Sequence, residues 1–311
     1  MIWRNCFFRL PLPRLLPGDF SIYLGVDFND KPSSIRYNTN QGVLFYSLQS
    51  KKADIYAWID GEESMEKKRG INSFTLHILA MLFMLCDHLW ATLFPAQEWL
   101  TCIGRLAFPI FAFMIAEGCY YTSNVKKYMQ RLFLFAVISE IPFNLIMGSS
   151  VIYPFHQNVL WTFLLGLLSI QIIEKAKKKQ KQWLLLLIIC LVLFMDYLLG
   201  TITMVDYNAA GILTVLLFYF FRKKTWISFV AQFAGMYYLN VVMLGDLYYP
   251  VTILGHHFEM PQQSFALLAL IPIWLYNREQ GYHSKWFKYF CYAFYPAHLL
   301  ILFVIWQWSI R

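Results

Sequence analysis

Ionisable side chains stand inside the apolar stretches of this 311-residue sequence, where a charge is costly and usually marks a site. Asp87 and His88 lie in the first such stretch, Arg105 in the second and His298 in the last. A histidine titrates near neutral pH and can act as a general base or a nucleophile. An arginine can stabilise negative charge that develops beside it. These residue types are suited to acid–base chemistry within an apolar bundle.

The candidate side chains have similar depths below the outer ends of the helices that carry them. At about 1.5 Å per residue, His88 and Arg105 lie about 9 Å down, Glu140 about 10 Å and His298 about 15 Å. Because neighbouring helix residues point about 100° apart, we expect Asp87 to pair with Arg105 rather than with His88. Two further polar residues are expected on the outer side: Asp206 near an outer helix end, and Asn158 in or beside an outer loop. The sequence therefore predicts one polar layer in the outer half of the bundle, although equal depth does not require convergence.

Each candidate in this layer also has a purely structural explanation. Asp87 and His88 could hydrogen-bond near the headgroup region, and Arg105 could be a snorkelling anchor. His298 could be an interhelical histidine whose hydrogen bonds are satisfied. Residue types and depth leave both explanations open.

A second polar group is expected at the inner end of the second and third apolar stretches. Glu117 and Arg131 lie on either side of the 122–127 turn and could form an ion pair across it. Lys126 and Lys127 stand in the turn itself. Together they would give the inner side a positive charge.

Composition places the chain in a membrane. Hydrophobic residues make up 59% of the sequence and charged residues 14%, against about 25% charged in soluble domains. The apolar runs are too long for barrel strands, so we expect an all-α bundle. A soluble globule, a disordered chain and a nucleic-acid-binding domain are excluded. The six cysteines have no regular spacing, and we predict neither a disulfide framework nor a metal site.

The charged loops set the expected topology. Hydropathy predicts about nine transmembrane helices, at 74–94, 99–121, 128–147, 157–173, 183–199, 207–221, 225–245, 261–277 and 286–308. Lys and Arg occur before the first helix and in every even-numbered loop, and are absent from every odd-numbered loop. The positive-inside rule then predicts a multi-pass protein of the bacterial cytoplasmic (inner) membrane, with its N-terminus inside and its C-terminus outside.

Residues 1–64 differ from the rest of the chain. They hold seven Lys and Arg and seven Asp and Glu, so the net charge of +8 belongs to residues 65–311. Met65 begins a charged leader that runs into the first apolar helix. We expect residues 1–64 to be a disordered extension or an over-extended gene prediction; a small soluble domain is the alternative.

Several motifs of the membrane region resemble those of the TraX family. Residues 71–88, which end in Cys-Asp-His, resemble the family's opening helix, and residues 103–118, which begin Ile-Gly-Arg, resemble its most recognisable motif. Further matches follow in order at 128–132, 138–143, 158–163, 206–211 and 289–299. The resemblance covers about 71–305, and departs from the family pattern at His77, where we expect Lys, and Arg278, where we expect Gly. Residues 1–64 have no counterpart in it.

The resemblance implies an integral membrane acetyltransferase domain over residues 65–311. Acetyl-CoA would be the cytoplasmic donor, and the acceptor would be an amine or hydroxyl of an extracytoplasmic pilin, surface glycan or lipid-linked molecule. We expect His88 to be the base or the acetyl-carrying nucleophile, Arg105 the electrostatic stabiliser and Asp87 the orienting residue. Expected donor-binding residues are Glu117, Lys126, Lys127 and Arg131. Expected acceptor-side residues are Glu140, Asn158, Asp206 and His298.

Two other function classes stay open. A transporter or flippase would also need polar residues at depth, although no internal repeat supports one. A non-enzymatic assembly factor for a surface appendage would need no acid–base residues.

Overall fold

The computed structural model describes residues 34–39, 42–47, 70–245, 247–253 and 255–309. The chain divides into two compact units, Met1–Lys68 and Arg69–Arg311. In the first unit, β1 (Ser34–Thr39) and β2 (Gly42–Ser47) pair as an antiparallel hairpin. The rest of the predicted extension at 1–64 lies outside the described residues, so its interpretation stays a prediction.

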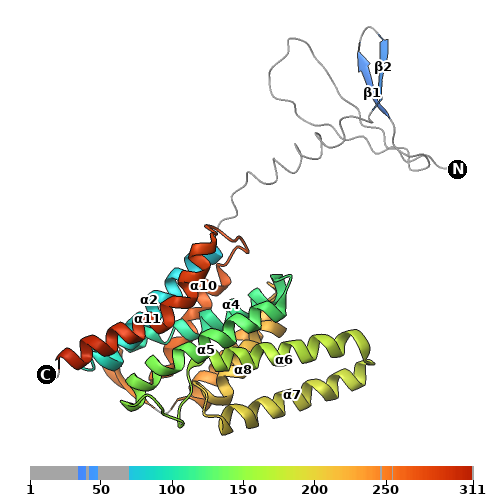
Figure 1. Cartoon of the computed structure of the whole chain (residues 1–311). Helices are drawn as coiled ribbons and strands as arrows, with labels where there is room; N and C mark the ends of the chain where they lie inside the picture. The colour runs from blue at the N-terminus through green and yellow to red at the C-terminus, as the bar shows by residue number, and fades with distance from the viewer. Residues whose placement is uncertain (1–33, 40–41, 48–69, 246, 254, 310–311) are drawn as a thin grey trace. The chain divides into compact units, whose positions relative to one another are not determined.

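Helices make up most of the second unit (Figure 1). They are α2 (Ser73–Thr92), α3 (Glu98–Gly104), α4 (Ala107–Tyr121), α5 (Val125–Gly148), α6 (Val159–Lys179), α7 (Gln182–Ile202), α8 (Asn208–Phe220), α9 (Trp226–Tyr237), the π-helix η1 (Tyr238–Met243), the 3₁₀-helix η2 (Gln262–Ala269), α10 (Leu270–Trp274) and α11 (Lys285–Ser309).

Seven of the described helical segments are long and apolar enough to cross a membrane. These segments match seven of the nine predicted spans. The other two predicted spans, at 207–221 and 261–277, are shorter apolar helices at Asn208–Phe220 and Gln262–Trp274. Thirteen helical residues extend about 20 Å, less than the roughly 30 Å of a hydrocarbon core. The mostly helical architecture with several candidate membrane spans is confirmed, whereas multi-pass insertion, the count of nine and the topology remain predictions.

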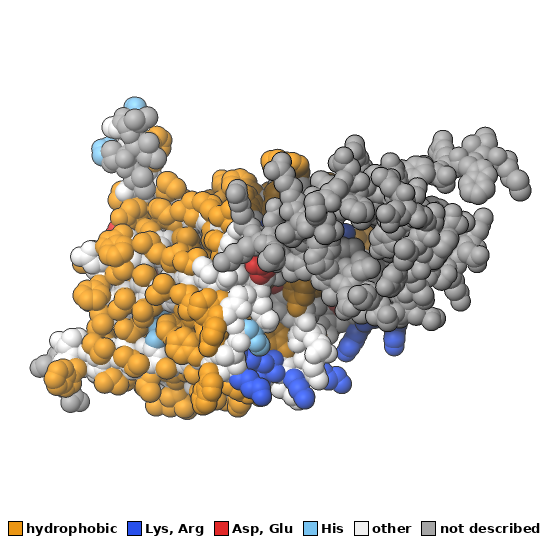
Figure 2. Space-filling model, turned by 90° about the horizontal axis from the view of Figure 1, so that it is seen from above, with side chains coloured by type: hydrophobic (Ala, Val, Ile, Leu, Met, Phe, Trp, Pro, Cys, Tyr) orange, Lys and Arg blue, Asp and Glu red, His pale blue; other side chains and the backbone are white. Residues whose placement is uncertain are grey.

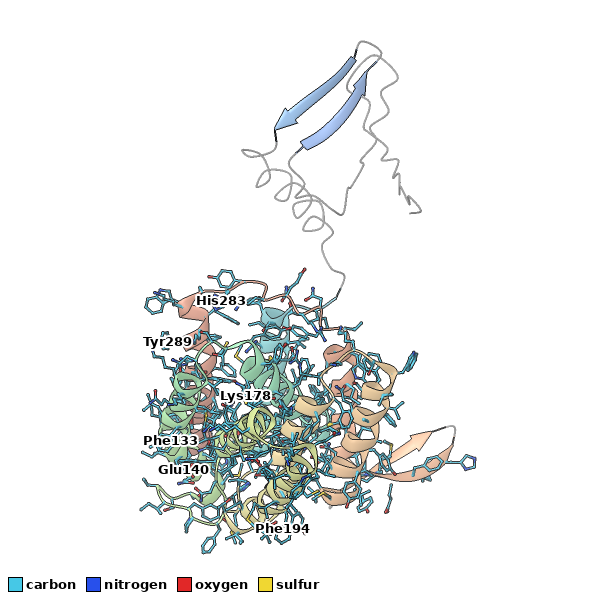
Figure 3. All side chains as sticks on the ribbon, turned by 90° about the vertical axis from the view of Figure 1, so that its right-hand side faces the viewer. Phe133, Glu140, Lys178, Phe194, His283 and Tyr289 are labelled. Carbon is cyan, nitrogen blue, oxygen red and sulfur yellow. The ribbon has the colours of Figure 1, made fainter. Side chains whose placement is uncertain are left out.

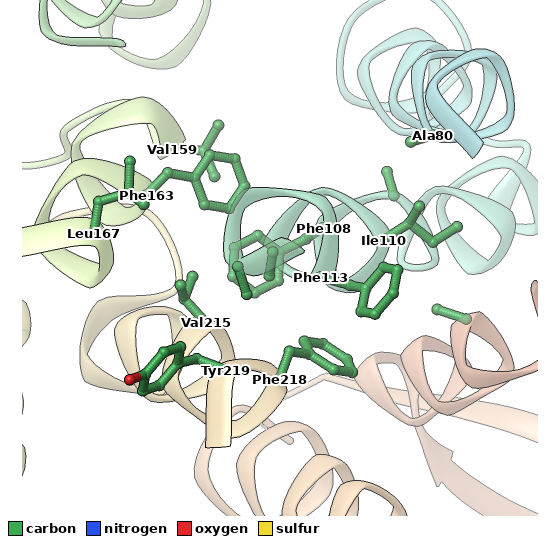
Figure 4. Close-up of a cluster of buried hydrophobic side chains, with 14 of the residues drawn as sticks. Ala80, Phe108, Ile110, Phe113, Val159, Phe163, Leu167, Val215, Phe218 and Tyr219 are labelled. Carbon is green, nitrogen blue, oxygen red and sulfur yellow. The ribbon is translucent and has the colours of Figure 1, made fainter. Parts of the chain in front are cut away.

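Helix α4 is the centre of the packing. It contacts α2, α6, α8, α10 and η2. Phe108, Ile110 and Phe113 of this helix are buried, and they lie between α6 and α8 on one side and α2 on the other (Figure 4). By contrast, α7 buries only 11% of its apolar window. Its leucines instead face outward, as expected of a lipid-facing helix.

The two ends of the helical unit's sequence come together in the fold. Helix α11 packs against both α2 and α5, and α2 and α11 run side by side (Figure 1). Phe133 of α5 and Tyr289 of α11 lie on the same side of the helices, while the β3–β4 hairpin, described below, projects from the other side (Figure 3). This arrangement makes it possible for the first and last helices to share a site.

The surface agrees with a membrane setting. Hydrophobic side chains cover a broad band of the face drawn in Figure 2, and Lys and Arg side chains gather beside it. Leu186, Leu187 and Phe194 of α7 are each more than half exposed, which is tolerated when the neighbouring solvent is lipid.

The expectation of a purely α-helical domain is wrong in one segment. Strands β3 (Tyr248–Ile253) and β4 (His256–Pro261) form an antiparallel hairpin. Aromatic and β-branched residues in this stretch favour strands. Gly255 has a φ of +81°, a conformation that a two-residue hairpin loop needs and that glycine adopts without strain.

Candidate functional site

Thr101 joins Asp87 to Arg105 at the contact between α2 and α3. Its hydroxyl donates to Oδ1 of Asp87 at 2.7 Å and accepts from Nη2 of Arg105 at 3.0 Å. The same Nη2 lies 3.6 Å from Oδ1 of Asp87. A Cβ on Gly104 would lie 2.4 Å from the Cβ of Asp87, so glycine is needed for this close approach. The expected pairing of Asp87 with Arg105 is confirmed.

Thr101 was not among the predicted site residues. It stands four residues before Arg105, and residues at that spacing share one face of a helix. A threonine at this position in an apolar helix was the signal that could have identified it.

His88 contacts His298, which comes from the opposite end of the helical unit's sequence. Nδ1 of His88 and Nε2 of His298 are 2.6 Å apart, and the ring planes lie within 20° of each other. Nδ1 of His298 lies 2.6 Å from the carbonyl oxygen of Phe294, and Tyr295 lies beside both imidazole rings. His298 was expected among the acceptor-side residues. In the fold it contacts His88, because α11 packs along α2, and its acceptor-side role stays a prediction.

The loop before α8 closes over this site. Tyr207 hydrogen-bonds Arg105 and stacks on Phe108, with ring centroids 3.9 Å apart. Its φ is +62°, and φ is also positive at Met204 and Asn208, which is unusual for residues other than glycine. Such strain persists only where surrounding contacts hold it, and it is common at functional sites.

Asp206 connects the loop to the outer polar layer. Its Oδ1 lies 3.3 Å from Nε2 of His156, and its backbone carbonyl accepts from the Thr162 hydroxyl at 2.6 Å. Asp206 also interacts electrostatically with His88 and Arg105. The hydrogen bond to Asp206 raises the pKa of His156 above its ordinary value, outweighing the effect of burial. His156 was not among the predicted site residues.

Glu140 and Asn158 form a second part of the outer layer. Oε2 of Glu140 accepts from the Trp161 indole at 2.9 Å and from the Asn158 amide. Asn158 also caps α6, since its Oδ1 accepts from the Leu160 backbone N–H at 3.1 Å. Oε1 of Glu140 is buried without a hydrogen-bond partner in the described structure. The Asn158 side chain therefore has a structural role, whereas Oε1 of Glu140 can still accept a hydrogen bond.

A cavity of about 630 Å³ leads towards the two histidines from the end of the bundle where α2 and α11 begin. It is lined at one end by Ser73, at the start of α2, and at the other by Met84 and Tyr295. Met84 precedes His88 by four residues and Tyr295 precedes His298 by three. The cavity therefore ends about one helical turn short of the histidine pair.

The lining of this cavity is positively charged. It includes Arg131, Arg278 and Lys288, and Lys288 is close enough to Arg131 for their charges to interact. Glu117 also lines it, but its carboxylate lies 3.5 Å from Arg222. The proposed ion pair of Glu117 with Arg131 is wrong. The α8 end places Arg222 beside Glu117, and Arg131 instead hydrogen-bonds Tyr292.

Only some of the predicted donor-binding residues line the cavity. Glu117 and Arg131 line the cavity, whereas Lys126 and Lys127 are exposed and stand outside its described lining. Lys288, Tyr292 and Tyr295 line it and were missed. Their i, i+4, i+7 spacing puts them on one helix face, a signal that was available in the sequence.

Comparison with known proteins gives two matches to this chain. The family model described as "TraX protein" matches residues 73–306. The chain is 29% identical over 119 residues to the "Probable fimbrial assembly protein FimC" of Dichelobacter nodosus. That alignment covers 35% of this chain and 49% of the relative, so the chain spans about half the length of the curated relative it matches. No solved structure matches.

Replacing Thr101 with valine should destabilise the protein. The substitution keeps the shape but leaves Asp87 and Arg105 without their shared hydroxyl, which costs about 1–3 kcal/mol. Thr92→Val is the matched control, because the hydrogen bond of the Thr92 hydroxyl goes to the His88 carbonyl of its own helix. Unfolding in mild detergent measures both free energies. Equal losses in the two variants would contradict a bridging role for Thr101.

The His156–Asp206 contact should make stability depend on pH. The pKa of His156 is raised on folding, so the contact stabilises fully below the unfolded pKa of about 6.5 and is lost as pH rises through the folded pKa. The thermal midpoint should therefore fall between about pH 6 and pH 8 by more in the wild type than in His156→Gln. Parallel midpoint curves for the two proteins would rule out this linkage.

Proposed function

Since the chain belongs to the TraX family, we propose that it is an integral membrane acetyltransferase. It moves an acetyl group from cytoplasmic acetyl-CoA to an amine or hydroxyl of an acceptor on the opposite side of the membrane. The relative named as a fimbrial assembly protein favours a pilus subunit over a glycan as that acceptor. The proposal includes nine spans in the bacterial inner membrane, with the first residues of α2 and α11 inside.

One observation carries the proposal: the cavity ends about one helical turn short of the His88–His298 pair. Acetyl-CoA has a polyanionic head and a long thin arm that ends in the thioester. Arg131, Arg278 and Lys288 would neutralise the phosphates at the cavity mouth. The aromatic walls would hold the arm, and its thioester would reach the end of the cavity at Tyr295.

The residues at that end can supply the required chemistry. His88 accepts the proton of the acceptor N–H or O–H as the acceptor atom attacks the thioester carbonyl. Nε of Arg105 is buried without a hydrogen-bond partner in the described structure, so it can donate to the oxyanion that forms. The carbon–sulfur bond then breaks, and the thiolate recovers the proton from His88. The products are the acetylated acceptor and CoA with its thiol protonated.

Asp87 acts on Arg105 in this scheme. Its carboxylate and the Thr101 hydroxyl hold the guanidinium in one position, so the charge is already oriented when the oxyanion forms. A two-step route, in which His88 carries the acetyl group before the acceptor takes it, uses the same residues.

A non-enzymatic assembly factor is the second candidate. The name of the Dichelobacter relative favours it, because that name specifies assembly and no chemistry. An assembly factor would tolerate loss of His88, and this difference separates the two candidates.

Acetyl transfer in membrane vesicles tests the proposal. Inside-out vesicles that enclose an envelope extract in their lumen and are given radiolabelled acetyl-CoA outside should label protein, and His88→Ala should abolish the label because the base is gone. His256→Ala, in the exposed β4 strand, is the matched histidine control and should retain full labelling. Sealed right-side-out vesicles should give none, since the donor cannot reach the cavity.

Two results would count against an acetyltransferase. Labelling by His88→Ala at the wild-type rate would remove His88 from the mechanism. Folded wild-type protein that yields no label with any envelope fraction would favour the assembly factor.

Lys288→Gln should raise the KM for acetyl-CoA. Loss of one charge-assisted phosphate contact costs about 1.5–3 kcal/mol, or roughly tenfold or more in KM, with little change in kcat. Lys126→Gln should leave KM unchanged, because Lys126 lies outside the cavity lining. Initial rates in the vesicle assay measure both. A larger rise in KM for Lys126→Gln than for Lys288→Gln would instead indicate that acetyl-CoA binds at the lysines of the 122–127 turn.

A further inference from the structure

We propose that His298 is a positioning residue that holds His88 in one tautomer, with the proton on Nδ1 and the reactive lone pair on Nε2. This inference rests on the proposed function for its catalytic consequence. The assignment of the protons follows from hydrogen bonding alone.

The carbonyl oxygen of Phe294 fixes the proton on His298. A carbonyl can only accept, so the His298 Nδ1 that lies 2.6 Å from it must carry a hydrogen. A neutral imidazole has one N–H, so Nε2 of His298 is then an acceptor. Nδ1 of His88, 2.6 Å away, must therefore be the donor. This leaves Nε2 of His88 as the unprotonated nitrogen.

The geometry of the two rings supports a hydrogen bond in the plane of the rings. The ring planes are 20° apart, and the ring centroids are 4.9 Å apart while the facing nitrogens are 2.6 Å apart. The centroid distance thus exceeds the nitrogen distance by about two ring radii, as expected when the rings meet edge to edge. Nε2 of His88 consequently points away from α11.

The His298 ring is held in place on several sides. It is 6% exposed, Phe294 stacks on it with a centroid distance of 4.8 Å, and Leu299 beside it is fully buried. A ring clamped by its own helix cannot turn to exchange its two nitrogens without losing the carbonyl contact. His298 therefore presents the same acceptor to His88 in every resting molecule.

Asp87 is not available for this role. Its Oδ1 receives the Thr101 hydroxyl and lies beside Arg105, so it orients the cation. The site thus divides the work between two orienting residues: Asp87 for Arg105 and His298 for His88. When Nε2 of His88 takes the acceptor proton, the Nδ1 hydrogen bond to His298 is kept and helps to stabilise the imidazolium. The proton then leaves with the thiolate, and His88 returns to the same tautomer.

Nitrogen NMR of the histidines tests the assignment without any need for activity. The full-length protein is labelled with ¹⁵N-histidine in detergent, and the His88 and His298 signals are identified by their loss in His88→Gln and His298→Gln. We expect a protonated Nδ1 and a bare Nε2 on both rings. A proton on Nε2 of His88, or on both nitrogens of His298, would overturn the proposal.

Variants at His298 test the catalytic consequence. Gln can still present an oxygen acceptor to Nδ1 of His88, so His298→Gln should keep kcat within about tenfold of the wild type. His298→Leu removes the acceptor and should lower kcat by about 100-fold or more with KM for acetyl-CoA unchanged, because wrongly oriented imidazole bases lose rate rather than binding.

Leu302→Ala is the packing control on the same helix. Leu302 is buried one turn beyond His298, and its truncation should cost stability without this loss of kcat. Equal kcat in the Gln and Leu variants would refute a positioning role. If the wild type transfers no acetyl group, the proposed function fails, while the NMR result still decides the tautomer.

Discussion

A polar group inside hydrocarbon must find its partner within the protein, and the helical unit is organised around that requirement. Water can satisfy a stray donor on a soluble protein, but a membrane helix has only its neighbours. The contacts of Asp87 with Thr101 and Arg105, and of His88 with His298, therefore do more than equip a site. They fix how α2 lies against α3 and α11, in a setting where apolar packing alone distinguishes poorly between helix faces and lipid.

The sequence predicted how deep each polar side chain lies in its helix, but it did not predict which of these side chains meet in the fold. Counting residues from the helix ends put His88, Arg105 and Glu140 in one layer, and the different directions of adjacent side chains predicted the contact of Asp87 with Arg105. The contact of His88 with His298 joins residues 210 positions apart. No periodicity within either helix specifies which distant helix will be its neighbour. The same limit explains why Glu117 was assigned to nearby Arg131, when the fold brings Arg222 to it.

Local rules failed where the chain departs from long helices. The β3–β4 hairpin lies in a segment that was predicted only as the loop between two spans, whereas the predicted span at 207–221 was already the shortest of the nine and differs from α8 by one residue at each end. Positive φ at Tyr207 and Asn208 sets the start of α8 after the charged Asp206. Lys288, Tyr292 and Tyr295 share one face of α11 by their spacing, but a long apolar helix contains other residues at the same spacing, so the sequence alone did not single out this face.

Because α8 is short, the distance that a group must travel to cross the protein is reduced. A helix of 13 residues leaves about 10 Å of an ordinary bilayer unspanned, and because α8 is buried among neighbouring helices, the polar loop before it occupies that depth in place of lipid. The outer polar layer can then be wet at a depth where the rest of the bilayer is oil. The cavity that enters from the opposite end stops about one helical turn short of the histidine pair, so the pair stands between that cavity and the polar layer. In the proposed reaction, donor and acceptor would each stay on their own side of this partition, and only the acetyl group would pass it.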